Sequence, residues 1–220
     1  MNQDNELLPA LESGEVHIII MGSLTYALDK QTSGIKVLGI SLNENNQPVY
    51  HSAIIVHKKS TITNLQELKG KKIAFGSRFS TSSFLIPALY LDRIGISLSD
   101  IQYEFVGTQE RILLGLLNYQ YDAGAVIVDM IRKAKPGTFK ILYKSDPIPG
   151  SPLVILKSRD KGFQENIIND LSRLRHYLKN HPQMIPFIEI DFRYGFSYEV
   201  NENIFDPLRL AYKRISPKIQ

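Results

Sequence analysis

The chain has 220 residues, 43% of them hydrophobic and 22% charged, which is ordinary for a globular protein and excludes a disordered, collagen-like or coiled-coil chain. Its 26 basic and 22 acidic side chains give a formal net charge of +4, and the lack of cysteine excludes disulfides, thiolate zinc sites and a cysteine nucleophile. The apolar runs are too short to cross a bilayer, and the first residues do not have the pattern of a secretory signal.

The predicted elements alternate between strands and helices along the chain. In chain order, the pattern predicts helix 5–13, strand 16–21, helix 24–31, strand 37–40, strand 50–57, a short helix or turn at 63–69, strand 72–75, helix 80–94, strand 102–106, helix 109–118, strand 123–127, helix 128–134, strand 139–143, strand 153–156, helix 163–179 and a last helix near 207–215. Such alternation predicts an α/β fold with parallel sheets that carry helices on both faces. In sheets of this kind, ligands bind beyond the carboxyl ends of the strands.

Two extended, β-rich segments indicate where the chain passes between two lobes. Residues 50–58 form the first, and residues 151–157 form the second, after a proline-rich stretch. The block between them has a β-α alternation of its own. We therefore predict a hinge of two extended crossover strands, with residues 1–57 and 151–220 in lobe 1, residues 58–150 in lobe 2, and a ligand bound between the lobes.

The basic residues lie in short clusters with acids between them, as at Lys58-Lys59 and Lys213-Arg214. A nucleic-acid-binding face usually concentrates its basic residues within a recognisable module. We therefore interpret these clusters as solvated surface and expect no nucleic-acid partner. The mild positive charge favours a small anionic ligand through its long-range field.

Four consecutive hydroxyl residues, Ser80, Thr81, Ser82 and Ser83, follow a predicted strand and open a predicted helix. Hydroxyl donors beside the N–H groups of a first helical turn suit one small tetrahedral anion. Capping a helix needs only one hydroxyl, so four in a row favour an anion site over a simple cap. The segment lacks the Gly-Lys-Ser/Thr ending of a phosphate-binding loop, which argues against a nucleoside triphosphate.

A second helix start of the same type follows the predicted strand 102–106. There, Thr108 follows Gly107 and precedes Glu110, which suits the first turn of the next helix. Taken alone, this pattern favours a helix cap. If both helix starts lie at one edge of one sheet, however, they can converge on one ligand.

Around these residues, the sequence resembles the substrate-binding proteins of phosphate, phosphite and phosphonate ABC transporters, the PhnD-like family. The resemblance runs through residues 68–76 and Ser80-Thr81-Ser82 to Pro87. Further segments match in the family's order and extend the resemblance over about residues 4–210; they are residues 13–16, 50–52, 107, 121–123 and 144–152. The resemblance implies a type II periplasmic-binding-protein fold, which agrees with the α/β pattern.

The same resemblance implies which residues hold the ligand. Ser80, Thr81 and Ser82 match the residues with which the family grips phosphoryl oxygens, and Tyr50 matches its cleft tyrosine. Ser83 stands where the family usually has glycine.

Three further matched positions carry altered side chains. Thr108 replaces a histidine, so one cationic donor to the phosphonate is lost. Asp129 replaces a longer glutamate that can pair with a ligand amine, and Ser151 replaces an acid of the aminophosphonate binders. The anion cradle thus persists while the amine cage is weakened. We expect phosphate, phosphite or a small phosphonate with a neutral substituent rather than 2-aminoethylphosphonate; a different ligand or a degenerate site stays open.

The family opens with a strand, a helix and an approach loop that have no counterpart in this sequence. We therefore expect a first lobe that is truncated at its N-terminus or completed by another segment. The loss of its central strand is expected to leave backbone groups unpaired on the strand at 16–21 or at 37–40.

The remaining residues carry no catalytic pattern. No histidine pair has metal-ligand spacing on one helix face, and Ser80 lacks a nucleophile-elbow motif, so we expect no metal, no cofactor and no enzyme activity. The resemblance implies a monomeric solute receptor, periplasmic or at the cell surface, that binds an oxyanion and delivers it to an ABC transporter permease. The alternatives are a ligand-sensing domain of a signalling protein and a truncated or degenerate paralogue without a ligand.

Overall fold

The computed structural model describes residues 4–30, 34–132 and 134–219. These divide into two compact units, unit 1 (Met1–Val49 and Pro149–Asp206) and unit 2 (Tyr50–Ile148 and Pro207–Gln220). Two short strands, β3 (Val49–Tyr50) and β9 (Ile148–Pro149), pair where the chain passes from one unit to the other.

Unit 1 is built on a four-stranded sheet in the order β1-β10-β2-β11. The strands are β1 (Ile19–Ile20), β2 (Ile35–Ser41), β10 (Pro152–Leu156) and β11 (Phe196–Ser197), and the helices are α1 (Asp4–Ser13), α2 (Ser23–Asp29) and α6 (Lys161–Asn180). All pairs of neighbouring strands are antiparallel. The prediction of a parallel sheet is therefore wrong for this unit, because the chain leaves along β2 and returns beside it along β10.

One hydrophobic core cluster of unit 1 lies between its sheet and helix α6. The buried cluster consists of Leu38, Leu153, Ile155 and Phe196. Phe163 and Leu171 of α6 pack against this cluster. The strand predicted over residues 16–21 shortens to β1, which lies at an edge of the described sheet.

Unit 2 contains a five-stranded sheet in the order β6-β5-β7-β4-β8. Strands β5 (Lys72–Phe75), β6 (Gln102–Phe105) and β7 (Ala123–Ile127) are parallel, whereas β4 (Ser52–His57) runs antiparallel to β7 and to β8 (Phe139–Lys144). The helices of this unit are α3 (Ile86–Arg93), α4 (Gln109–Leu117), α5 (Val128–Arg132) and α7 (Asp206–Ile215), of which α7 begins at the boundary with unit 1.

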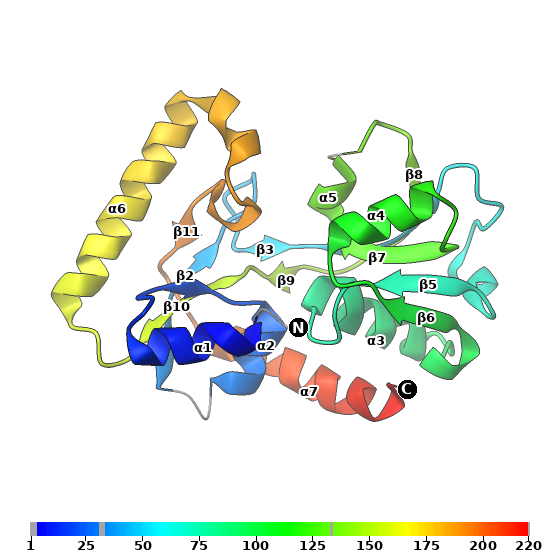
Figure 1. Cartoon of the computed structure of the whole chain (residues 1–220), viewed down its shortest axis with the longest axis horizontal. Coiled ribbons are helices and arrows are strands. Elements are labelled where there is room, and N and C mark those ends of the chain that lie inside the picture. The colour runs from blue at the N-terminus through cyan, green and yellow to red at the C-terminus, as the bar shows by residue number, and fades with distance from the viewer. Residues whose placement is uncertain (1–3, 31–33, 133, 220) are drawn as a thin grey trace. The chain divides into compact units, whose positions relative to one another are not determined.

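Helices cover both faces of the unit 2 sheet (Figure 1). Ile112 and Leu116 of α4 pack over Ala74 on one face. Because side chains alternate along a strand, the neighbouring Phe75 points to the other face, where its ring meets Phe84 at 5.2 Å just before α3.

Short helical turns complete the described chain. They are η1 (Leu65–Leu68), η2 (Thr81–Leu85), η3 (Leu98–Asp100), η4 (Pro182–Phe187), η5 (Ile190–Phe192), η6 (Glu202–Phe205) and η7 (Ser216–Lys218). The helix predicted over 80–94 is in fact η2, a π-helical turn, followed by α3. Pro87 is the second residue of α3, directly after η2.

The unit boundaries differ from the predicted lobes at three segments, the shortest of which is residues 149–150, which belong to unit 1. Residues 50–57 belong to unit 2 because β4 pairs there with β7 and β8. Residues 207–220 belong to unit 2 because Arg214 and Lys218 both form ion pairs with Asp92 on α3. Within the described part of the chain, no helix is long and apolar enough to cross a membrane.

Candidate functional site

Most of the predicted site residues lie at one edge of the unit 2 sheet. The parallel strands β5, β6 and β7 end at this edge and are followed by residues 80–83, by Thr108 and by Asp129, respectively. Because β4 is antiparallel to β7, its first residue, Ser52, lies at the same edge, opposite Ile127. We call this the strand-end edge, and we call residues 80–83 the hydroxyl turn.

The hydroxyl turn begins the helical segment η2–α3. The Ser80 hydroxyl accepts a hydrogen bond from the backbone N–H of Ser83 at 3.1 Å, and the two hydroxyl oxygens lie 2.5 Å apart. Ser80 is thus the N-cap of η2. Thr81 and Ser82 are buried in the first turn behind it and do not serve as the cap, so the capping function accounts for only part of the motif.

Gly76 joins the loops that follow β5 and β6. Its N–H donates to the Ser83 carbonyl at 3.1 Å, and its own carbonyl accepts from the N–H of Gly107 at 2.9 Å. A Cβ atom on Gly76 would lie 2.1 Å from the Ser83 hydroxyl oxygen. Only glycine therefore allows the strand to approach the hydroxyl turn this closely.

Ser52 anchors the hydroxyl turn to strand β4. Its hydroxyl donates to the Ser82 carbonyl at 2.6 Å, and its N–H donates to the Ser145 hydroxyl at 3.0 Å. His51 Nδ1 lies 2.8 Å from the Ser145 carbonyl oxygen, which can only accept, so this nitrogen carries a proton. The sequence motif Tyr50-His51-Ser52 contributed to the resemblance, but sequence reasoning gave Ser52 and Ser145 no role.

Thr108 and Asp129 have local partners. The Thr108 hydroxyl accepts from the N–H of Arg111 at 3.3 Å, which confirms a helix cap at the start of α4. The neighbouring Gln109 accepts from the N–H of Ile127 through its side chain at 2.7 Å, which holds the start of α4 at the end of β7. Asp129 forms an ion pair with Arg132, one turn along α5, at 3.6 Å.

The two remaining predicted residues lie outside this group. Tyr50 is the second residue of strand β3, and Ser151 lies in unit 1 between β9 and β10. The N–H of Ser151 donates to the Ser41 hydroxyl at 2.9 Å, and its carbonyl accepts from the N–H of Ser41 at 3.0 Å.

Sequence reasoning missed an acid next to Ser151. Asp191, on η5, receives side-chain hydrogen bonds from Ser151 and Ser41. Burial raises the pKa of Asp191, and these two hydrogen bonds partly oppose the increase. A lone acid between Ile190 and Phe192 is the only sequence signal for this position.

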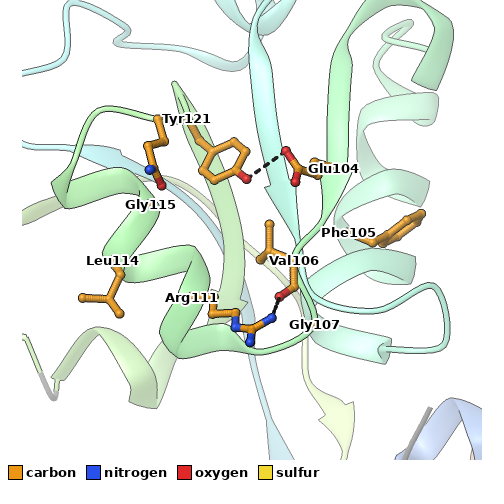
Figure 2. Close-up of a pocket in the computed structure, with 9 residues that line it drawn as sticks. Glu104, Phe105, Val106, Gly107, Arg111, Leu114, Gly115 and Tyr121 are labelled. Atoms are coloured by element: carbon orange, nitrogen blue, oxygen red, sulfur yellow. Dashed lines mark hydrogen bonds between the residues drawn. The ribbon is translucent and has the colours of Figure 1, made fainter. Parts of the chain in front are cut away.

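A pocket of about 470 Å³ lies beside strand β6 and helix α4 (Figure 2). Within it, the Tyr121 hydroxyl donates to Glu104 at 2.9 Å, and Arg111 donates to the Val106 carbonyl at 3.4 Å. Hydrogen bonds from Tyr121 and Lys72 hold the pKa of Glu104 below its usual value. The residues of the hydroxyl turn are not among those that line this pocket. Glu104 and Arg111, which do line it, form local hydrogen bonds and are not part of the predicted site.

No cluster of metal-ligating side chains occurs among the residues that the structure describes. The side chains described at the strand-end edge are the hydroxyl groups of the hydroxyl turn, Ser52 and Thr108, together with the carboxylate of Asp129.

A family model described as the periplasmic substrate-binding protein of ABC transporters for phosphonate matches residues 1–190. The chain belongs to this phosphonate-binding family.

Two curated relatives are similar to the chain. The phosphonates-binding periplasmic protein of Escherichia coli K12 is 28% identical over 172 residues, which cover 73% of this chain and 51% of the relative. The phosphate-import protein PhnD of Mycolicibacterium smegmatis is 29% identical over 158 residues, which cover 63% of this chain and 49% of the relative. The chain thus spans about half the length of the curated relatives that it matches.

The fold is also found in solved structures. PhnD1 of Prochlorococcus marinus, solved in complex with methylphosphonate, superposes with a TM-score of 0.79 at 17% identity, covering 100% of this chain and 85% of that chain. This likeness shows the fold, which is that of the type II periplasmic binding proteins, as the α/β pattern and the resemblance predicted.

Proposed function

We propose that the chain is the solute-binding component of an ABC importer, and that it binds phosphate, phosphite or a small phosphonate at the strand-end edge of unit 2. The observation that carries the proposal is the hydroxyl turn. Thr81 and Ser82 are only 4% and 5% exposed, yet they carry hydroxyl groups in the first turn of a helix at this edge.

Buried hydroxyl groups at a helix start are suited to an anion for two reasons. The first turn of a helix leaves N–H groups without carbonyl partners inside the helix, and the helix dipole adds partial positive charge there. Hydroxyl and N–H donors also make stronger hydrogen bonds to a charged oxygen than to a neutral one. In this proposal Ser80 shapes the turn as its cap, whereas Thr81 and Ser82 donate to the ligand.

The altered positions support a ligand without an amine. The carboxylate of Asp129, at the position of the acid that can pair with a ligand amine, is already paired with Arg132. This contact favours phosphate, phosphite or methylphosphonate over 2-aminoethylphosphonate. The roles of Tyr50 and Ser151 in binding stay predictions.

The partner in this proposal is an ABC transporter permease, and the location is the periplasm or the cell surface. Membership of a family of periplasmic substrate-binding proteins supports both. A ligand-sensing domain with the same fold is the second candidate, and a neighbouring permease gene or an attached signalling segment would distinguish the two.

Calorimetric titration tests the proposed binding site. Phosphate, phosphite, methylphosphonate and 2-aminoethylphosphonate are titrated into the wild type and into a Thr81→Val/Ser82→Ala double variant. Losing two hydrogen bonds to a charged ligand is expected to weaken binding by roughly 100-fold or more. The matched control is Ser99→Ala, which removes an exposed hydroxyl from η3 and is expected to leave affinity unchanged.

Two results would count against the proposal. Unchanged affinity in the double variant would remove the hydroxyl turn from the site. A wild type that none of the four anions stabilises in thermal unfolding would support the degenerate paralogue instead, because a bound ligand raises the unfolding temperature.

A further inference from the structure

At the edge of the unit 2 sheet opposite the strand-end edge, the corner formed by β4 and β8 is rich in lysine. Strand β4 ends there at His57 and strand β8 begins there at Phe139. The adjoining segments, residues 57–66 and 134–141, contain Lys58, Lys59, Lys135 and Lys140 but no Asp, Glu or Arg.

Backbone and side-chain contacts hold these two segments together. The N–H of Lys58 donates to the Thr138 carbonyl at 2.8 Å, and Lys140 Nζ donates to the Ser60 carbonyl at 2.6 Å. Thr138 in turn donates through its N–H and hydroxyl to the carbonyl of Lys135. The four lysines therefore form one local surface rather than two separate runs.

An exposed aromatic ring lies within the same surface. The Tyr119 ring meets the His57 ring at 4.8 Å, and the His57 ring meets Phe139 at 6.4 Å. Tyr119 is 65% exposed, and Ile141, on β8, is 47% exposed. We call Lys58, Lys59, Lys135, Lys140 and Tyr119 together the lysine patch.

Two acids that lie near the patch in sequence, Glu67 and Asp122, have other partners. The carboxylate of Glu67 accepts hydrogen bonds from Thr63 and Asn64. The carboxylate of Asp122 accepts from the backbone N–H of Lys72 at 2.9 Å. Neither of these contacts places a carboxylate on a lysine of the patch.

We propose that the lysine patch docks the protein on an anionic lipid surface. The composition favours lipid over an acidic protein, because lysine is depleted at protein interfaces whereas arginine is enriched, and the basic side chains of the patch are all lysines. Lysine side chains bring mobile point charges to anionic headgroups, and a tyrosine ring suits the boundary between headgroups and acyl chains.

Docking at this edge leaves the strand-end edge of unit 2 uncovered, because the two edges lie at opposite ends of the same strands. The proposal therefore does not depend on the identity of the oxyanion, and it can fail without affecting the proposed function.

Vesicle co-sedimentation tests the proposal. The purified chain is mixed with phosphatidylcholine vesicles that contain phosphatidylglycerol at about one lipid in three, and with vesicles of phosphatidylcholine alone. We expect binding to the anionic vesicles only. We expect this binding to fall steeply between about 0.1 M and 1 M salt, because the Debye length shortens as salt is added.

A charge-matched pair of variants locates the surface. Lys58→Glu/Lys59→Glu/Lys135→Glu is expected to weaken vesicle binding by roughly tenfold or more. The control, Lys157→Glu/Lys161→Glu/Lys179→Glu, reverses three exposed lysines of unit 1 and is expected to bind clearly more tightly than the patch variant. Circular dichroism and unchanged oxyanion affinity show that both variants are folded.

Three results would overturn the proposal. They are no preference of the wild type for anionic vesicles, equal loss of binding in the two triple variants, and retention of the wild type by immobilised polyglutamate without any binding to vesicles. The last result would assign the patch to an acidic protein surface.

Discussion

The hydroxyl of Ser52, at the start of β4, donates to the carbonyl oxygen of Ser82 at 2.6 Å, so a residue 30 positions earlier in the chain fixes the hydroxyl turn. Both residues are buried. The bond connects β4 to the turn that follows β5, although β7 lies between these two strands in the sheet.

Replacing Ser52 with alanine is expected to affect both stability and binding. The change leaves the buried Ser82 carbonyl without this donor, which costs about 1–3 kcal/mol of unfolding free energy. Oxyanion affinity should fall as well, because Ser82 loses its anchor. Denaturant unfolding and calorimetric titration measure the two effects, with Ser99→Ala as the control; a loss of stability with full affinity would contradict the anchoring role.

Replacing Gly76 with alanine is expected to destabilise unit 2. The new Cβ would lie 2.1 Å from the Ser83 hydroxyl oxygen and 3.0 Å from the Ser83 Cβ. Such a clash typically costs about 1–3 kcal/mol. Because the obstacle is one side chain, Gly76→Ala combined with Ser83→Gly should recover part of the loss. A double-mutant cycle from denaturant unfolding measures the coupling, and simple additivity would show that the clash is relieved elsewhere.

Asp191 is expected to make stability fall as pH rises. Burial raises its folded-state pKa above the unfolded value of about 3.9. The folded state therefore binds this proton more tightly, and the resulting stabilisation, which is full below the unfolded pKa, is lost as pH rises through the folded pKa. Relative to wild type, Asp191→Asn should gain stability across this window. Unfolding temperatures measured against pH test this, and parallel curves for the two proteins would contradict it.

Asp92 is expected to act in the opposite direction. Lys218, followed by Arg214, lowers its pKa, so its contribution to stability is present above the unfolded pKa and is lost as pH falls through the folded pKa. Asp92→Asn should therefore flatten the acid side of the unfolding-temperature profile. Because the two basic partners are partly exposed, added salt should reduce the effect in the wild type. An acid limb that keeps its slope in the variant would show that other carboxylates dominate it.

Much of the fold could be predicted because local patterns determine it. Strands 72–75 and 123–127 form as predicted, and α4 and α6 begin and end within two residues of the predicted helices. Apolar spacing and capping residues such as Thr108 act over one or two turns, so they are visible in the sequence.

The features that the sequence did not reveal depend on contacts between distant segments. The antiparallel sheet of unit 1 follows from the route of the chain through the other unit, which no local pattern records. Helix α7 was predicted almost to the residue, but its place in unit 2 depends on Asp92.

The candidate site divides in the same way. Residues 80–83 were found because hydroxyl groups at a helix start form a local motif. Ser52 and Ser145 support that turn over long distances in sequence, and a lone serine in a strand carries no signal of its own. The association of Asp191 with Ser151 was invisible for the same reason.

The chain passes between the two units at residues 49–50, 148–149 and 206–207, so each unit is assembled from two separate segments. No single cut can therefore release an intact unit. Expressing unit 2 alone requires a design that rejoins residues 207–220 to residues 50–148, for example by a linker in a permuted order. A fragment that ends at residue 148 would lack α7 together with both basic partners of Asp92.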